Sequence, residues 1–198
     1  RMGFNNDGCH QVRQRLEKAK LSKKNKVFGI NIGKNSITPN EYAIQDYLQV
    51  LSKCDSLENN YYVMNISSPN TKGLRSLANK DFLRKLAEEI KSLRIKGVKD
   101  IWIKLSPDIA RKKFQELISV ITEEGYAGII LSNTHSVQSP TRGGLSGHPL
   151  SMLSSQALEW AFAVHQGSLA MIGSGGILSG IDILEKIRRG AYAVQIYT

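Results

Sequence analysis

The chain has 198 residues, of which 41% are hydrophobic and 22% are charged, so it can bury a core of the size found in one globular domain. These proportions exclude a disordered chain, and the formal net charge of +10 is compatible with nucleic acid, an anionic bilayer surface, or an anionic cofactor and substrate. Cys9 and Cys54 stand far apart without a Cys-x-x-Cys motif, so we expect no disulfide framework and no metal.

Basic residues gather in one short stretch between Lys18 and Lys26. No aromatic residues alternate with these lysines, as a base-stacking surface would require, so the stretch is typical of a solvated loop. We therefore expect no nucleic-acid partner, although a basic nucleic-acid-binding module remains an alternative. The chain contains no apolar run of about 18 residues, so neither a membrane-spanning helix nor a signal peptide is predicted within it.

Six apolar runs with polar or glycine-rich ends are predicted to be strands, with helices between them. The strands are expected at residues 27–33, 61–66, 101–108, 128–134, 169–176 and 191–198. The helices are expected at residues 9–20, 38–51, 81–93, 110–124, 151–164 and 179–189. The remaining long segment, residues 136–149, is rich in Gly, Ser and Pro and is expected to be a loop.

Two of the predicted helices carry capping signals at their starts. Thr38, Pro39 and Glu41 have the spacing of a capping box, with Thr38 as the N-cap and Pro39 as the first helical residue. Ser179 can cap the last helix. These signals predict that helices begin directly after Thr38 and Ser179.

The alternation of strands and helices is typical of an α/β protein. Each strand is apolar along its length and polar at its carboxyl end, as buried parallel strands are. A doubly wound sheet and an eightfold barrel both satisfy this pattern, and both place ligand sites beyond the carboxyl ends of the strands. The pattern alone does not choose between them.

The polar segment Asn65 to Thr71 follows the second strand and contains amides and hydroxyls almost throughout. Such groups can bind a planar polar ligand without adding formal charge, and Pro69 ends the ladder because it lacks an N–H. An ordinary loop has a similar composition. The segment is therefore either a binding loop or an ordinary loop.

Two further features favour an anionic ligand. The stretch Gly173 to Gly176 follows a strand and precedes the helix at Ser179, which suits a phosphate, although a simple tight turn also explains the glycines. Lys104 lies inside a strand, where an ammonium requires an anionic or polar partner unless it reaches solvent at the strand end. The four histidines have no acid at telling spacing and are assigned no catalytic role.

The motifs closely resemble those of dihydroorotate dehydrogenases of class 2, the quinone-dependent class. Asn65 to Thr71 with Gly73-Leu74-Arg75 is similar to the active-site segment of that family. Five further segments match in the same order, together with the closing residues to Thr198: Gly3 to Asn6, Gly29 to Asn35, Lys104 to Asp108, Ser132 to Thr134, and Gly143 to Gly147. The resemblance covers essentially the whole chain.

The resemblance implies an FMN-binding (β/α)8 TIM barrel of the α/β class. It implies the oxidation of (S)-dihydroorotate to orotate in pyrimidine (UMP) biosynthesis, with hydride transfer to FMN and reoxidation of the flavin by ubiquinone or menaquinone. The alternative within the same fold is another FMN barrel oxidoreductase, such as a class 1 enzyme that uses fumarate or NAD. Class 1 enzymes use a cysteine as the base, and no cysteine lies near Ser68.

The resemblance also implies roles for individual residues. Ser68 falls at the position of the catalytic base, and because a hydroxyl is a weak base it requires a hydrogen-bonded relay. The cofactor positions are Asn31, Asn65, Lys104, Ser132, Gly147, Gly176, Tyr197 and Thr198, and the substrate positions are Phe4, Asn65, Asn70, Asn133 and Thr134. One departure is His135, where the family usually has a second threonine.

Compared with that family, residues 1–198 are expected to be an incomplete barrel of about six βα units. The first two strands, the final helix and the N-terminal membrane-binding helices of the family are expected to be absent from it. The resemblance implies peripheral membrane association through such a segment. The expected location is the cytoplasmic side of a bacterial inner membrane, with the mitochondrial inner membrane as the alternative.

Overall fold

The computed structural model describes residues 5–19, 27–57, 61–93, 100–137 and 143–197. Six parallel strands form the main sheet: β1 (Gly29–Ile32), β2 (Tyr61–Asn65), β3 (Asp100–Leu105), β4 (Gly128–Leu131), β7 (Ala170–Ser174) and β8 (Ala193–Gln195). The helices are α1 (Cys9–Ala19), α2 (Ala43–Cys54), α3 (Lys80–Ser92), α4 (Arg111–Glu123), α5 (Ser151–His165) and α6 (Gly180–Arg188). The predicted alternation of strands and helices is confirmed.

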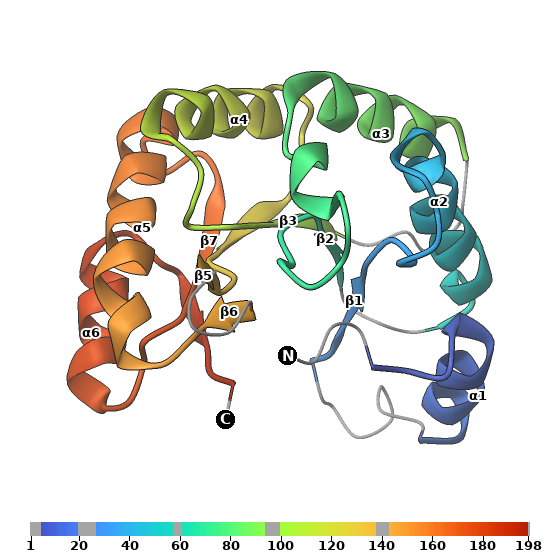
Figure 1. Cartoon of the computed structure of the whole chain (residues 1–198), viewed down its shortest axis with the longest axis horizontal. Coiled ribbons are helices and arrows are strands. Elements are labelled where there is room, and N and C mark those ends of the chain that lie inside the picture. Colours follow the sequence, from blue (N-terminus) through green and yellow to red (C-terminus); the bar gives the residue numbers. More distant parts are fainter. Residues whose placement is uncertain (1–4, 20–26, 58–60, 94–99, 138–142, 198) are drawn as a thin grey trace.

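The strand order distinguishes the two architectures that the sequence left open. The strands are hydrogen-bonded in the order β1-β2-β3-β4-β7-β8, which is also their order along the chain. A doubly wound sheet reverses direction at a switch point, whereas a barrel adds strands in sequence. Figure 1 shows the helices in one arc outside the strands, so the fold is a half-barrel and the predicted partial TIM barrel is confirmed.

The two faces of the sheet differ in character. Alternate strand residues such as Ile103 and Leu105 are fully buried in the core beneath the helices. The intervening residues face the inside of the curve, and Lys104 is one of them. Its Nζ donates to Gln195 Oε1 at 2.9 Å, a bond from β3 to β8 that passes over two intervening strands. Such a bond requires a strongly curved sheet.

The capping box predicted at Thr38 is wrong. The first turn is a short 3-10 helix, Asn40–Tyr42, with no side-chain cap, and the α-helix begins only at Ala43. The buried Lys34 explains the difference because its Nζ donates to the backbone carbonyls of Asn35, at 2.9 Å, and Thr38, at 2.5 Å. These bonds hold residues 35–38 as a turn.

Ser179 behaves as predicted. Its side chain accepts from Asp182 N, and the Asp182 carboxylate accepts from Ser179 N at 2.8 Å, which completes a capping box. A second difference lies in residues 136–149, which were expected to be loop. Two short strands, β5 (His135–Val137) and β6 (Gly143–Leu145), pair there as an antiparallel ribbon.

None of the helices within the described residues combines the length with the apolar composition that crossing a membrane would require.

Candidate active site

Polar residues collect at one rim of the half-barrel, where the parallel strands end. Ser68, Asn133 and Gly176 follow β2, β4 and β7, and Lys104 is the penultimate residue of β3. Because all six strands run in the same direction, their carboxyl ends meet at this rim. The rim is therefore the candidate active site, as the sequence predicted.

A network of amides and hydroxyls joins the ends of β2 and β4. Asn65 Oδ1 accepts hydrogen bonds from Ser67 N at 3.3 Å, Ser67 Oγ at 3.0 Å and Asn133 Nδ2 at 3.3 Å. Asn133 Nδ2 also donates to Ser67 Oγ at 3.0 Å. Among the described residues, the Asn65 Nδ2 group has no hydrogen-bond partner, so it is available to a ligand. The network brings together two amides that the sequence places 68 positions apart.

Ser68 is 7% exposed and lies one residue beyond this network. Its Oγ accepts from Asn70 N at 3.3 Å, a local turn that fixes the loop. Within the described part of the chain, no acceptor lies within hydrogen-bond distance of its hydroxyl proton. Ser68 can therefore donate a hydrogen bond to a ligand or a bound water.

Lys104 has a neutral partner in this structure. The sequence predicts an anionic or polar partner for this ammonium, and the protein supplies the carboxamide oxygen of Gln195. Burial lowers the pKa of Lys104 below its ordinary value because the ammonium is partly removed from water. An anion bound at the rim would favour the charged form, so the site suits a ligand that develops negative charge.

The loop between β7 and α6 is built from backbone. Gly175 and Gly176 have φ of +99° and +70°, and Ser154 Oγ donates to Gly175 O at 2.9 Å. A Cβ on Gly176 would lie 2.4 Å from the Cα of Ser151, so only glycine fits. The start of α6 is occupied by Asp182, so an anion near this loop would be held by the glycine backbone rather than by the helix start.

The other predicted positions lie in varied surroundings. Ser132 is buried, and its N–H donates to Ser174 O at 2.9 Å, while Gly147 has φ of +76° at the start of a short 3-10 helix, His148–Leu150. Asn31 and Tyr197 are exposed, and neither forms a side-chain hydrogen bond among the described residues. Phe4 and Thr198 lie outside the described residues.

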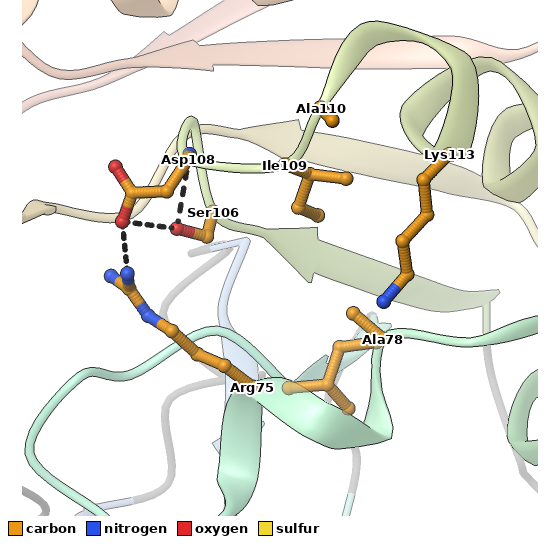
Figure 2. Close-up of a pocket in the computed structure, with 8 residues that line it drawn as sticks. Arg75, Ala78, Ser106, Asp108, Ile109, Ala110 and Lys113 are labelled. Carbon is orange, nitrogen blue, oxygen red and sulfur yellow. Dashed lines mark hydrogen bonds and ion pairs between the residues drawn. The ribbon is translucent and has the colours of Figure 1, made fainter.

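Sequence reasoning missed a charged cluster beside the network. Arg75 and Asp108 form an ion pair, and the His135 ring contacts the same carboxylate (Figure 2 shows the pair). His135 has no acid at telling spacing in the sequence, and the fold brings Asp108 to it from 27 positions away. Only the position of Asp108 just after a strand could have indicated the contact.

The chain is similar in sequence to proteins of one known family. The family model described as dihydroorotate dehydrogenase matches residues 1–198. The chain is 37% identical over 207 residues to dihydroorotate dehydrogenase (quinone) of Christiangramia forsetii and 39% identical over 212 residues to that of Neisseria meningitidis. These matches cover 100% of the chain but 59% and 62% of the relatives, so the chain spans about three fifths of their length.

Solved structures give the same result. A crystal structure of DHODH from Eimeria tenella in complex with ferulenol superposes with a TM-score of 0.88 at 31% identity. The ligand-free form superposes with a TM-score of 0.90 at 32% identity. Each comparison covers 100% of this chain, and 60% and 62% of the respective Eimeria chains.

Proposed function

The chain belongs to the dihydroorotate dehydrogenase family, and from that premise we propose that the protein oxidises (S)-dihydroorotate to orotate in pyrimidine biosynthesis and passes the electrons to a quinone. Family membership agrees with the resemblance found in the motifs. The observation that carries the proposal is the network of Asn65, Ser67 and Asn133 at the carboxyl ends of β2 and β4, because paired amides match the alternating N–H and C=O groups of a pyrimidine ring.

The rim fits FMN on two observations. Among the described residues, the Asn65 amide has a donor without a partner, and the Lys104 ammonium is paired with a neutral amide alone. When bound, FMN supplies the hydride acceptor of the reaction. The residues proposed to hold it are Asn31, Asn65, Lys104, Ser132, Gly147, Gly176, Tyr197 and Thr198.

Substrate is proposed to lie over the amide network. Asn65, Asn70, Asn133 and Thr134, together with Phe4, would contact the pyrimidine. The amides bind the ring by hydrogen bonds and orient C5 toward Ser68. The Asn133 Oδ1 atom accepts from Thr134 N at 2.8 Å, so this loop presents its amide in one orientation.

Ser68 is proposed to remove the C5 proton, while hydride leaves C6 and the C5=C6 double bond of orotate forms. Its hydroxyl is buried and is held by Asn70 N, so it is oriented before substrate binds. A serine hydroxyl requires a second acceptor for its own proton. A water next to Ser68 would complete this relay.

The names of the curated relatives support a quinone as the electron acceptor. A ubiquinone or menaquinone resides in a bilayer, so we propose peripheral membrane association. The proposed location is the cytoplasmic side of a bacterial inner membrane, with the mitochondrial inner membrane as the alternative. Residues 1–198 are proposed to belong to the FMN-binding barrel domain.

The proposed electron acceptor, a quinone, and the proposed catalytic base, Ser68, can be tested together in the full-length protein. With dihydroorotate as the donor, we expect turnover with a soluble quinone and none with fumarate or NAD. Ser68→Ala should lower kcat about 100- to 10,000-fold, the range for loss of a general base, and keep bound flavin. Ser92→Ala is the matched control, because Ser92 lies at the end of α3 and bonds only Glu89 O at 2.7 Å within the described residues.

Two outcomes would contradict the proposal. Turnover with fumarate or NAD in place of quinone would assign the protein to another class of FMN barrel. A preparation without flavin that binds nucleic acid with steep salt dependence would favour the basic binding module instead.

A further inference from the structure

A guanidinium ties together the loops behind the candidate active site. Arg75 lies on a short 3-10 helix, Leu74–Leu77, that follows the Ser68 loop. Its Nε donates to Ser67 O at 2.9 Å, its Nη2 to Thr134 O at 2.7 Å, and its Nη1 to Ser136 Oγ at 2.8 Å. One planar group therefore holds segments that follow β2 and β4.

Asp108, in the loop that follows β3, fixes the guanidinium. Its carboxylate pairs with Arg75, accepts from Ser136 N at 3.0 Å and from Ser106 Oγ at 3.2 Å, and contacts the His135 ring. Burial opposes ionisation of this carboxyl, but the Ser136 N–H and the Arg75 charge outweigh it and hold the pKa of Asp108 below its ordinary value. Asp108 therefore stays charged at neutral pH and orients Arg75.

A pocket lies beside these loops. A cavity of about 220 Å³ lies between Arg75, Asp108, Ile66 and the start of α4, with Lys113 on its far side (Figure 2). The side chains of Ile66, Leu74 and Leu77 beside this pocket are buried in the core. The hydrogen bonds of Arg75 therefore add to the packing that holds these loops.

The residues that Arg75 holds are the direct neighbours of the proposed catalytic groups. Ser67 precedes Ser68, and Thr134 follows Asn133. We propose that Arg75 is a positioning residue. It sets the separation between the base loop, which follows β2 and carries Ser68, and the substrate-amide loop, which follows β4 and carries Asn133. It does not touch the reacting atoms and acts through the two carbonyl groups that it binds. This inference rests on the proposed function, since it assigns Arg75 a part in the same reaction.

The geometry of the guanidinium makes the inference specific. An arginine directs its N–H groups in a fixed fork, whereas a lysine ammonium is a point charge on a flexible stem. Lysine at position 75 could keep the pair with Asp108 but could not reach both carbonyls. A shift of about 1 Å in a reacting group can cost about 100-fold in rate. The Asn133 amide keeps its hydrogen bonds to Asn65 and Ser67, so substrate binding should be retained. A loss of the arginine should therefore lower kcat more than it raises KM.

The test uses the full-length protein with its flavin. Arg75→Lys is expected to lower kcat for dihydroorotate oxidation roughly 10- to 100-fold, with KM and flavin content little changed. Arg75→Ala should lose at least as much, and millimolar methylguanidinium should restore part of its rate. Asp108→Asn keeps the Arg75 guanidinium but removes the carboxylate charge that orients it, and it should show a smaller loss of kcat. This variant tests the inference if the arginine variants fold poorly.

Arg84→Lys is the matched control, because Arg84 lies on the surface of α3 and pairs with Glu123 at 3.2 Å, away from the rim. It should leave kcat and KM unchanged. The inference is overturned if Arg75→Lys and Asp108→Asn both fold and keep wild-type kcat, or if methylguanidinium fails to act on a folded Arg75→Ala. An inactive wild-type protein would instead overturn the proposed function, so the two failures are distinguishable.

Discussion

Two cations support different loops of the rim, and they do so by different chemistry. Arg75, whose side chain is 24% exposed, holds the loops after β2 and β4 and is paired with a carboxylate. Lys186, which is 1% exposed, holds the start of α5 by donating to Ser151 O at 3.1 Å, to Ser155 Oγ at 2.8 Å and to Ser154 Oγ. Ser154 in turn donates to Gly175 O, so Lys186 supports the loop between β7 and α6 that contains Gly175 and Gly176, here called the glycine loop.

The difference lies in what each cation is paired with. Arginine stays charged in proteins, and the pKa of Asp108 lies below its ordinary value, so the support of the base loop does not change at neutral and alkaline pH. Lys186 has only neutral hydrogen-bond partners among the described residues. Burial, and then the nearby charge of Arg189, lowers its pKa to about 8. The glycine loop is therefore the side of the rim whose support depends on pH.

The largest effect is predicted for the substitution Gly176→Ala in the glycine loop. The new Cβ would meet backbone atoms of Ser151 at 2.4 and 2.5 Å, and φ of +70° strains any other residue. Overpacking and strain of this kind each cost about 1–3 kcal/mol, so we expect a fall in the free energy of unfolding of several kcal/mol and loss of bound flavin.

Gly180→Ala is the matched control, because a Cβ there meets nothing within 4 Å and no left-handed φ is involved. Thermal unfolding followed by circular dichroism, with flavin release recorded in parallel, gives both quantities. If Gly176→Ala were as stable as Gly180→Ala, the close approach of this loop to α5 would be wrong.

A smaller effect separates the two cations by pH. The pKa of Lys186 in the folded state, about 8, lies below the ordinary 10.5, so burial of the charged form destabilises the fold below pH 8. As pH rises from 8 toward 10.5, the folded state loses this proton before the unfolded state does, and the free energy of unfolding increases by up to about 3 kcal/mol, at about 1.4 kcal/mol per pKa unit.

Denaturant unfolding across this pH range measures the slope in wild type, in Lys186→Met and in the control Lys53→Met, whose side chain is exposed on α2. Lys186→Met should lose the rise, and Lys53→Met should keep it. An identical slope in all three proteins would mean that Lys186 is not the buried lysine that titrates.

The sequence predicted what depends on residue type along one strand or helix. Apolar runs with polar ends gave all six strands of the main sheet, and the loop from Asn65 to Thr71 was located because its side chains carry its chemistry. The capping box at Ser179 formed because its partners are local. The equivalent signal at Thr38 failed because Lys34 binds the carbonyls of that turn.

The contacts that the sequence could not predict join distant strands. Lys104 and Gln195 are 91 positions apart, and Arg75 and Thr134 are 59 apart. Their approach depends on the curvature of the sheet and on strand register, which no local pattern encodes. The β5–β6 ribbon was missed because Gly143 and Gly144 have the composition of a loop, and only pairing with His135 to Val137 makes them a strand.

The carboxyl-end rim is proposed to hold a flavin and a dihydropyrimidine together. Addition of dihydroorotate to the full-length protein without oxygen tests it most directly, with the visible spectrum as the readout. We expect the blue absorption of bound oxidised flavin before the addition and its bleaching afterwards. A colourless protein, or a flavin spectrum that dihydroorotate leaves unchanged, would contradict it.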